Sequence, residues 1–161
     1  MNGKTRNDGF TLVECLIAAT ILTVAVLAVS AAIGSAQAQV HYALKTQQAV
    51  RLAEALMGRI LALPYNDPDG VSSPGPEAGE SSVWKFDNMD DFDGYAESAG
   101  QIKDAAGNPF PAEYQIFSRS VTVRYETVNV PGLGNIPGLR ATVTVRDPAG
   151  VTWTLSRFVG A

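Results

Sequence analysis

The sequence predicts an α+β protein: a long N-terminal helix, membrane-spanning in its first half, packed on a small antiparallel sheet of about three to four strands. Three observations carry this prediction. An uncharged apolar run covers residues 15–33, a stripe of apolar residues at helical spacing follows it, and apolar and polar residues alternate in three runs near the C-terminus. A period of 3.6 indicates helix, and a period of 2 indicates strand.

The first element is a helix that begins near Phe10. Its uncharged run from Cys15 to Ile33 spans about 28 Å at ~1.5 Å per residue, which matches a hydrocarbon core of about 30 Å. Lys4 and Arg6 precede the run. The positive-inside tendency therefore places the residues before the run in the cytoplasm, and the bulk of the chain would then face the periplasm or the exterior.

The helix is expected to continue outward as an amphipathic segment. Apolar residues recur there at steps of three or four, and Pro64 ends the pattern. This stripe would cover the apolar face of the sheet. Its members are Ala49, Leu52, Leu56, Ile60 and Leu63.

The C-terminal alternation predicts three half-buried strands. Residues 130–138, rich in Gly and Pro, are expected to connect the first two, and Asp147–Gly150 to form a tight turn between the last two. Connections this short make all three strands antiparallel. Apolar residues expected on the alternating face are Val121, Val123, Tyr125, Ala141, Val143, Val145, Val151, Trp153 and Leu155.

The most specific feature lies at the start of the helix. The string Gly9-Phe10-Thr11-Leu12-Val13-Glu14 runs directly into the apolar stretch, and an ionisable group attached to a membrane span is costly and usually functional. This string resembles the N-terminal motif of the type IV pilin-like family, which includes pilins, minor pilins and the pseudopilins of type II secretion. The resemblance covers roughly residues 4–63.

The resemblance implies a structural subunit and no enzyme. It implies cleavage by a prepilin peptidase between Gly9 and Phe10, N-methylation of the new terminus, and assembly with other pilin-like subunits through the helix. The subunit would be stored as a single-pass protein of the inner membrane, with a cytoplasmic leader and a periplasmic C-terminal domain. It would then enter a periplasmic or surface filament of a type IV pilus or a type II secretion pseudopilus.

This interpretation divides the chain into five segments. They are a leader (1–9), a transmembrane and assembly half of the helix (10–33), an amphipathic outer half (34–63), an irregular loop region (64–113) with short strands expected near 82–86, and the antiparallel sheet (114–161).

Glu14 has a physical reason to matter in assembly. Cleavage after Gly9 creates a positive amine at Phe10, and in an apolar bundle an unpaired amine and an unpaired carboxylate are both costly. Pairing Glu14 with the amine of an adjoining subunit would offset both costs. The single cysteine, Cys15, excludes an intramolecular disulfide, and the helix has no proline before Pro64. These absences favour a minor pilin or a minor pseudopilin.

Two other interpretations of the N-terminal segment remain open. Ala36-Gln37-Ala38 follows an apolar run, so a signal peptidase could release a soluble protein after Ala38. An uncleaved single-pass anchor could instead hold a periplasmic binding module. The net charge of −4 argues against nucleic acid as a partner. His41 is the only histidine, and no zinc spacing or phosphate-binding loop accompanies it, which argues against catalysis.

Four carboxylates in the irregular region form a candidate calcium site, because calcium is a hard cation that takes oxygen ligands. They are Asp87, Asp90, Asp91 and Asp93. The spacing of an EF-hand loop is not met, and a solvated acidic turn at Asp93-Gly94 is the alternative. No other cofactor is expected.

Overall fold

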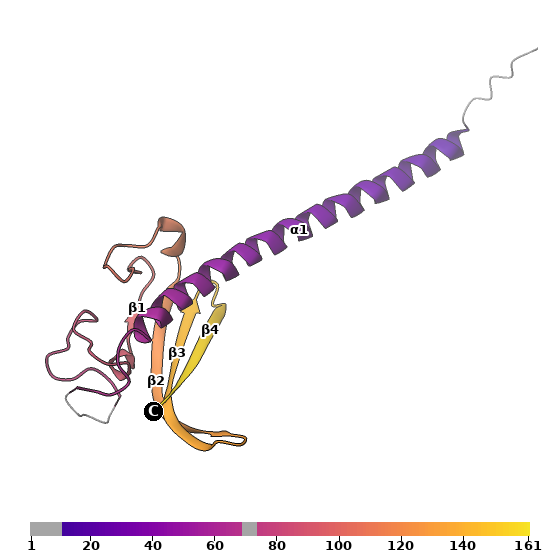
Figure 1. The fold of residues 1–161 in the computed structure, drawn as a ribbon. Helices are drawn as coiled ribbons and strands as arrows, with labels where there is room; N and C mark the ends of the chain where they lie inside the picture. The colour runs from indigo at the N-terminus through magenta and orange to yellow at the C-terminus, as the bar shows by residue number, and fades with distance from the viewer. Residues whose placement is uncertain (1–10, 69–73) are drawn as a thin grey trace, which may run out of the picture. The chain divides into compact units, whose positions relative to one another are not determined.

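The computed structural model of the chain describes residues 11–68 and 74–161. The chain divides into two compact units, one up to Leu44 and one from Lys45 to Ala161, and one helix runs through the boundary. Figure 1 shows the elements as a ribbon. In chain order they are the helix α1 (Leu12–Ile60), the 3₁₀ turn η1 (Asp90–Phe92), β1 (Ala96–Glu97), the 3₁₀ turn η2 (Ala112–Tyr114), β2 (Ser118–Val130), β3 (Gly134–Arg146) and β4 (Thr152–Gly160).

The strands form one antiparallel sheet in the order β1-β2-β3-β4. β2 and β3 pair along all 13 residues of each strand, whereas β1 adds only two residues at the edge. Buried positions alternate along much of β2 and β3, because one face of the sheet is covered and the other faces solvent. The predicted α+β fold, a long helix with a small antiparallel sheet, is confirmed.

The expected connection over residues 130–138 is wrong, because most of it is strand. β3 begins at Gly134, and only residues 131–133 form the turn. The turn closes with a 3.0 Å hydrogen bond from Leu133 N to Val130 O. Pro137 is tolerated in β3 because the ladder with β4 runs only from Gly138 onward, so a proline without N–H lies at the end of that ladder, where its carbonyl accepts a 2.9 Å bond from Ala161 N. This end of the β2–β3 hairpin therefore extends past β4 (Figure 1).

The short strands expected near 82–86 are also absent from the structure. This segment is a turn with a 2.7 Å hydrogen bond from Lys85 N to Ser82 O. The turn lets Val83 and Phe86 both pack against the core, while Trp84 stacks on the guanidinium of Arg59 at 4.1 Å. The extra strand, β1, comes ten residues later.

The core of the second unit lies between the end of α1 and one face of the sheet (Figure 1). The predicted stripe is confirmed for Ala49, Leu52, Leu56 and Ile60, which are all buried, and Leu63 is half-buried. Beyond Ile60 the chain tightens into a turn with a 3.2 Å bond from Leu63 N to Ile60 O. The apolar residues that face the stripe from the strands include Val121, Val123, Leu139, Ala141, Val143, Val145, Trp153 and Leu155.

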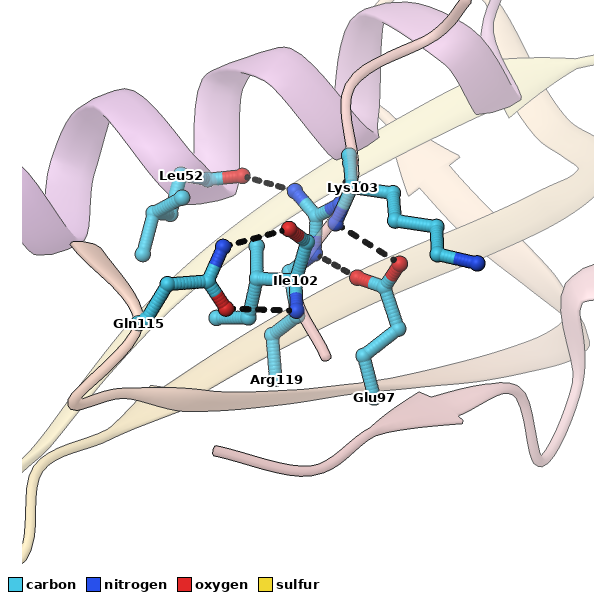
Figure 2. Close-up of polar contacts among 6 residues, drawn as sticks. All are labelled: Leu52, Glu97, Ile102, Lys103, Gln115 and Arg119. Atoms are coloured by element: carbon cyan, nitrogen blue, oxygen red, sulfur yellow. Dashed lines mark hydrogen bonds and ion pairs between the residues drawn. The ribbon is translucent and has the colours of Figure 1, made fainter. Parts of the chain in front are cut away.

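A buried arginine on β2 ties the helix to the sheet and to the loop region. Figure 2 shows the Arg119 guanidinium in an ion pair with Glu97 of β1. Its Nη1 donates to the Leu52 carbonyl of α1 at 3.1 Å, and its Nη2 donates to the Lys103 carbonyl at 2.5 Å. We call these four residues the Arg119 clamp. A buried charge is stable only when it is paired and hydrogen-bonded in this way.

We expect Gly138→Ala to destabilise the second unit by about 1–3 kcal/mol, the usual cost of overpacking a well-packed site. Gly138 is buried in β3, and a Cβ added there would overlap the Val159 carbonyl oxygen and the Phe158 ring. The change in free energy of unfolding can be measured by urea denaturation of the full chain in detergent.

Gly58→Ala is the matched control, because a Cβ at this exposed helical position meets nothing within 4 Å. Alanine is about 1 kcal/mol more favourable than glycine inside a helix, so this variant should be slightly more stable than the wild type. Equal stability of the two variants would contradict the packing argument at Gly138.

Candidate functional site

The first candidate site is the start of α1, where Thr11 and Glu14 cap the helix reciprocally. Glu14 Oε2 accepts hydrogen bonds from Thr11 N and Thr11 Oγ1, both at 2.8 Å. In return, Thr11 Oγ1 accepts a 3.2 Å bond from Glu14 N. This is a capping box, in which the first turn's unpaired N–H groups are satisfied by the two side chains.

The capping box adds a local role to Glu14 that the sequence analysis missed. The sequence signal for this helix cap is the Thr-x-x-Glu spacing of Thr11 and Glu14 before an apolar run. Glu14 therefore has a partner within its own chain. Any role in assembly must be tested separately from its contribution to the start of the helix.

The apolar half of α1 is exposed along its whole length in the first unit. Every residue from Thr11 to Leu44 is exposed. One 18-residue window has a mean hydropathy of 2.6 with none of it buried, so by length and composition α1 can cross a membrane. Cys15 lies on this segment as a free, exposed thiol. The large exposed apolar residues are Leu12, Val13, Leu16, Ile17, Ile21, Leu22, Val24, Val26, Leu27, Val29, Ile33, Val40 and Leu44.

The proposed processing residues, Gly9 and Phe10, lie outside the described residues. The structure places Glu14 three residues beyond Thr11, in the first turn of the exposed helix.

The second candidate site is an acidic cluster in the loop between α1 and β1. Glu77, Glu80 and Asp91 each place a carboxylate oxygen within 4.8 Å of the others, and Asp91 is buried. We call these three residues the acidic triad. Asp91 Oδ2 accepts from the backbone N–H groups of Asp87 at 2.9 Å and Asn88 at 3.1 Å. Glu80 Oε2 accepts from Glu77 N at 3.0 Å.

Burial and hydrogen bonding between carboxyl groups perturb this cluster. A hydrogen bond with the Glu80 carboxyl group, together with burial and a hydrogen bond with Asp91, raises the pKa of Glu77 to about 8. Burial likewise raises the pKa of Asp91, although two backbone hydrogen bonds oppose the shift. Burial also raises the pKa of Asp90, and a hydrogen bond with the Tyr125 hydroxyl partly opposes this rise. Perturbed carboxyl groups mark sites where a proton or a cation can be held.

The four aspartates of the predicted calcium site have different surroundings. Asp90 and Asp91 are buried in η1, and Asp87 is exposed. Asp93 Oδ1 accepts a 2.8 Å bond from Val123 N of β2, which ties the loop to the sheet. Among the described residues, only Asp91 of the four belongs to a group of three possible metal ligands. Glu77 and Glu80 were missed because they lie at least eleven residues before Asp91 in the sequence.

The features expected of a catalytic centre are not assembled around His41. This residue is exposed on α1, and the acidic triad, the one possible metal-ligating group within 11–68 and 74–161, contains no histidine or cysteine. A hydrolytic triad would need a nucleophile and a base within hydrogen-bond reach.

Residues 4–30 match the family model described as the prokaryotic N-terminal methylation motif, which is the prepilin signal of type IV pilin-like proteins. The resemblance inferred from Gly9–Glu14 is confirmed over this part of the chain. The motif supports a pilin-like substrate of prepilin peptidase and indicates a structural subunit rather than an enzyme. No curated protein and no solved structure matches the chain.

Proposed function

We propose that this chain is a structural subunit, a minor pilin or a minor pseudopilin, that prepilin peptidase cleaves after Gly9 and that joins a filament through α1. The observation that carries the proposal is the coincidence of two features in one segment. The methylation motif covers residues 4–30, and from Leu12 onward this segment belongs to an apolar helix whose residues are exposed up to Leu44.

An exposed apolar helix needs a non-aqueous environment. Each large apolar side chain gains about 1.5–3 kcal/mol when it leaves water, and contiguous apolar surface of this extent marks a membrane or protein contact. A bilayer supplies that environment before assembly, and the helices of neighbouring subunits supply it afterwards. The same surface can therefore serve both stages.

The outer part of α1 has a different task in this proposal. Its stripe from Ala49 to Ile60 is buried against the sheet, so it carries the folded second unit. Lys45 and Asp147 reinforce this attachment with a 3.0 Å ion pair. The division of α1 leaves the first half for assembly and the second half for anchoring the domain.

Glu14 is proposed to pair with the amine of Phe10 on an adjoining subunit. Oε2 already accepts two bonds from Thr11, and Oε1 is the oxygen that an incoming amine would contact. A carboxylate has about four acceptor positions, so it can keep the helix cap and accept an ammonium together. The pair would neutralise two charges inside the apolar bundle.

N-terminal mass spectrometry of the membrane-extracted protein tests the proposal. The expected mature terminus is N-methyl-Phe10, and a Gly9→Leu variant, with a bulky side chain at the cleavage point, should retain the leader. A terminus at Gln39 would instead establish secretion after Ala38. An intact Met1 or Asn2 in the wild type would establish an uncleaved anchor, and either result would overturn the proposal.

A further inference from the structure

The acidic triad leaves carboxylate oxygens buried without hydrogen-bond partners. Among the described residues, Glu77 Oε1 and Asp91 Oδ1 are both buried and unpartnered. Asp91 is completely buried, and its other oxygen is already used by the backbone of Asp87 and Asn88. Most buried polar atoms in native proteins are hydrogen-bonded, so each exception requires a physical reason.

The triad also lacks a positive partner. Within the described residues the ion pairs are Lys45–Asp147, Arg119–Glu97 and Arg140–Glu126, and none of them includes a triad member. When all three groups are ionised, their carboxylate oxygens, which lie within 4.8 Å of one another, repel, and burial of Asp91 strengthens that repulsion. A cation at their centre would satisfy the two open oxygens and remove the repulsion in a single step.

The ligand set selects the type of cation. All three side chains offer oxygen, which suits a hard cation, and the set lacks the histidine and cysteine ligands that zinc sites usually have. Calcium accepts six to eight oxygens in flexible geometry, whereas magnesium demands a near-ideal octahedron and keeps its waters. Carboxylates from separate turns of an irregular loop suit the flexible geometry, and water would complete the shell.

We propose that Glu77, Glu80 and Asp91 form a calcium site that fastens the outer part of the loop between α1 and β1 to η1, which is anchored in the core of the second unit. Asp91 lies in η1 beside Phe92, which is buried in the core and contacts the rings of Phe86 and Tyr95. Glu77 and Glu80 lie on the preceding stretch, which a 3.0 Å bond from Gly75 N to Asp90 O brings to η1. Calcium would therefore join the outer part of the loop to a fixed point of the core.

The affinity expected is that of a module outside the cytoplasm, with a Kd of about 10⁻⁴–10⁻³ M. A ligand that binds only the folded state stabilises it by mass action. Saturating calcium at about 5 mM should therefore raise the Tm of the second unit by several degrees over the value in EDTA.

The test uses the full chain in detergent, with isothermal titration of CaCl₂ and thermal unfolding in EDTA or calcium. Glu80→Gln and Asp91→Asn each keep an oxygen for the backbone bonds, so they should fold while weakening calcium binding at least tenfold. Thermal unfolding in EDTA checks that they fold. Glu113→Gln, at an exposed position of η2, makes the same charge change away from the triad and should bind calcium as the wild type does.

Several outcomes would overturn the proposal. They are the absence of calcium binding to the wild type at about 5 mM, unchanged affinity in both triad variants, or an equal response to magnesium. Loss of binding in Asp93→Asn with Glu80→Gln unaffected would instead support the site predicted from the sequence, which is built on Asp87, Asp90, Asp91 and Asp93. None of these readouts requires a filament, so they are independent of the proposed function.

Discussion

Glu14→Gln is expected to leave the protein in the membrane and to block its incorporation into filaments. Glutamine keeps an oxygen for Thr11 N and so retains the helix cap, but it removes the charge that would pair with the Phe10 amine. Leaving one member of a buried ion pair alone costs about 3–5 kcal/mol. The ratio of filament-borne to membrane-borne protein, measured after shearing and fractionation, should fall at least about a hundredfold.

Thr11→Ala separates the two roles of Glu14. This variant loses the hydroxyl bond to Glu14 and the cap on Glu14 N, which costs the helix start about 1 kcal/mol, but it keeps the charge. It should be incorporated almost as well as the wild type. If Glu14→Gln were incorporated normally, or if Thr11→Ala failed as severely as Glu14→Gln, the interchain pairing would be refuted.

Arg119→Met is expected to destabilise the second unit by about 3–5 kcal/mol, the cost of breaking a buried ion pair from one side. The substitution leaves the Glu97 carboxylate, whose side chain is 9% exposed, without its cation. It also removes the donors to the Leu52 and Lys103 carbonyls, so α1 and the loop region lose their common attachment (Figure 2). Urea unfolding of the full chain in detergent measures the loss.

The double variant Arg119→Met with Glu97→Gln should recover a large part of this stability, since a neutral partner carries a smaller desolvation penalty. Glutamine can still accept the 3.3 Å bond from Lys103 N. Arg157→Met, at an exposed site on β4, should stay within about 0.5 kcal/mol of the wild type. A double variant no more stable than Arg119→Met would show that the carbonyl contacts, and not the unpaired charge, set the cost.

Much of the fold follows from local pattern. Three patterns recur several times along the sequence: the apolar run, the stripe at Ala49–Ile60 and the alternation in β2, β3 and β4. Within each pattern, every repeat assigns its residues to the same buried or exposed positions. The β2–β3 turn was misplaced because glycine and proline usually interrupt strands. Whether Pro137 is tolerated depends on where β4 stops pairing, which is a property of the whole sheet.

The candidate sites divide in the same way. The sequence by itself determined the start of the helix, because Gly9 to Glu14 and the apolar run act through neighbours within one or two turns. Only the tertiary structure decided the acidic triad and the Arg119 clamp. Glu77 meets Asp91, and Leu52 meets Arg119, only after the loop and the sheet have packed on α1. Local periodicity contains no information on contacts between residues so distant in the chain, whereas burial of the shared core forces them together.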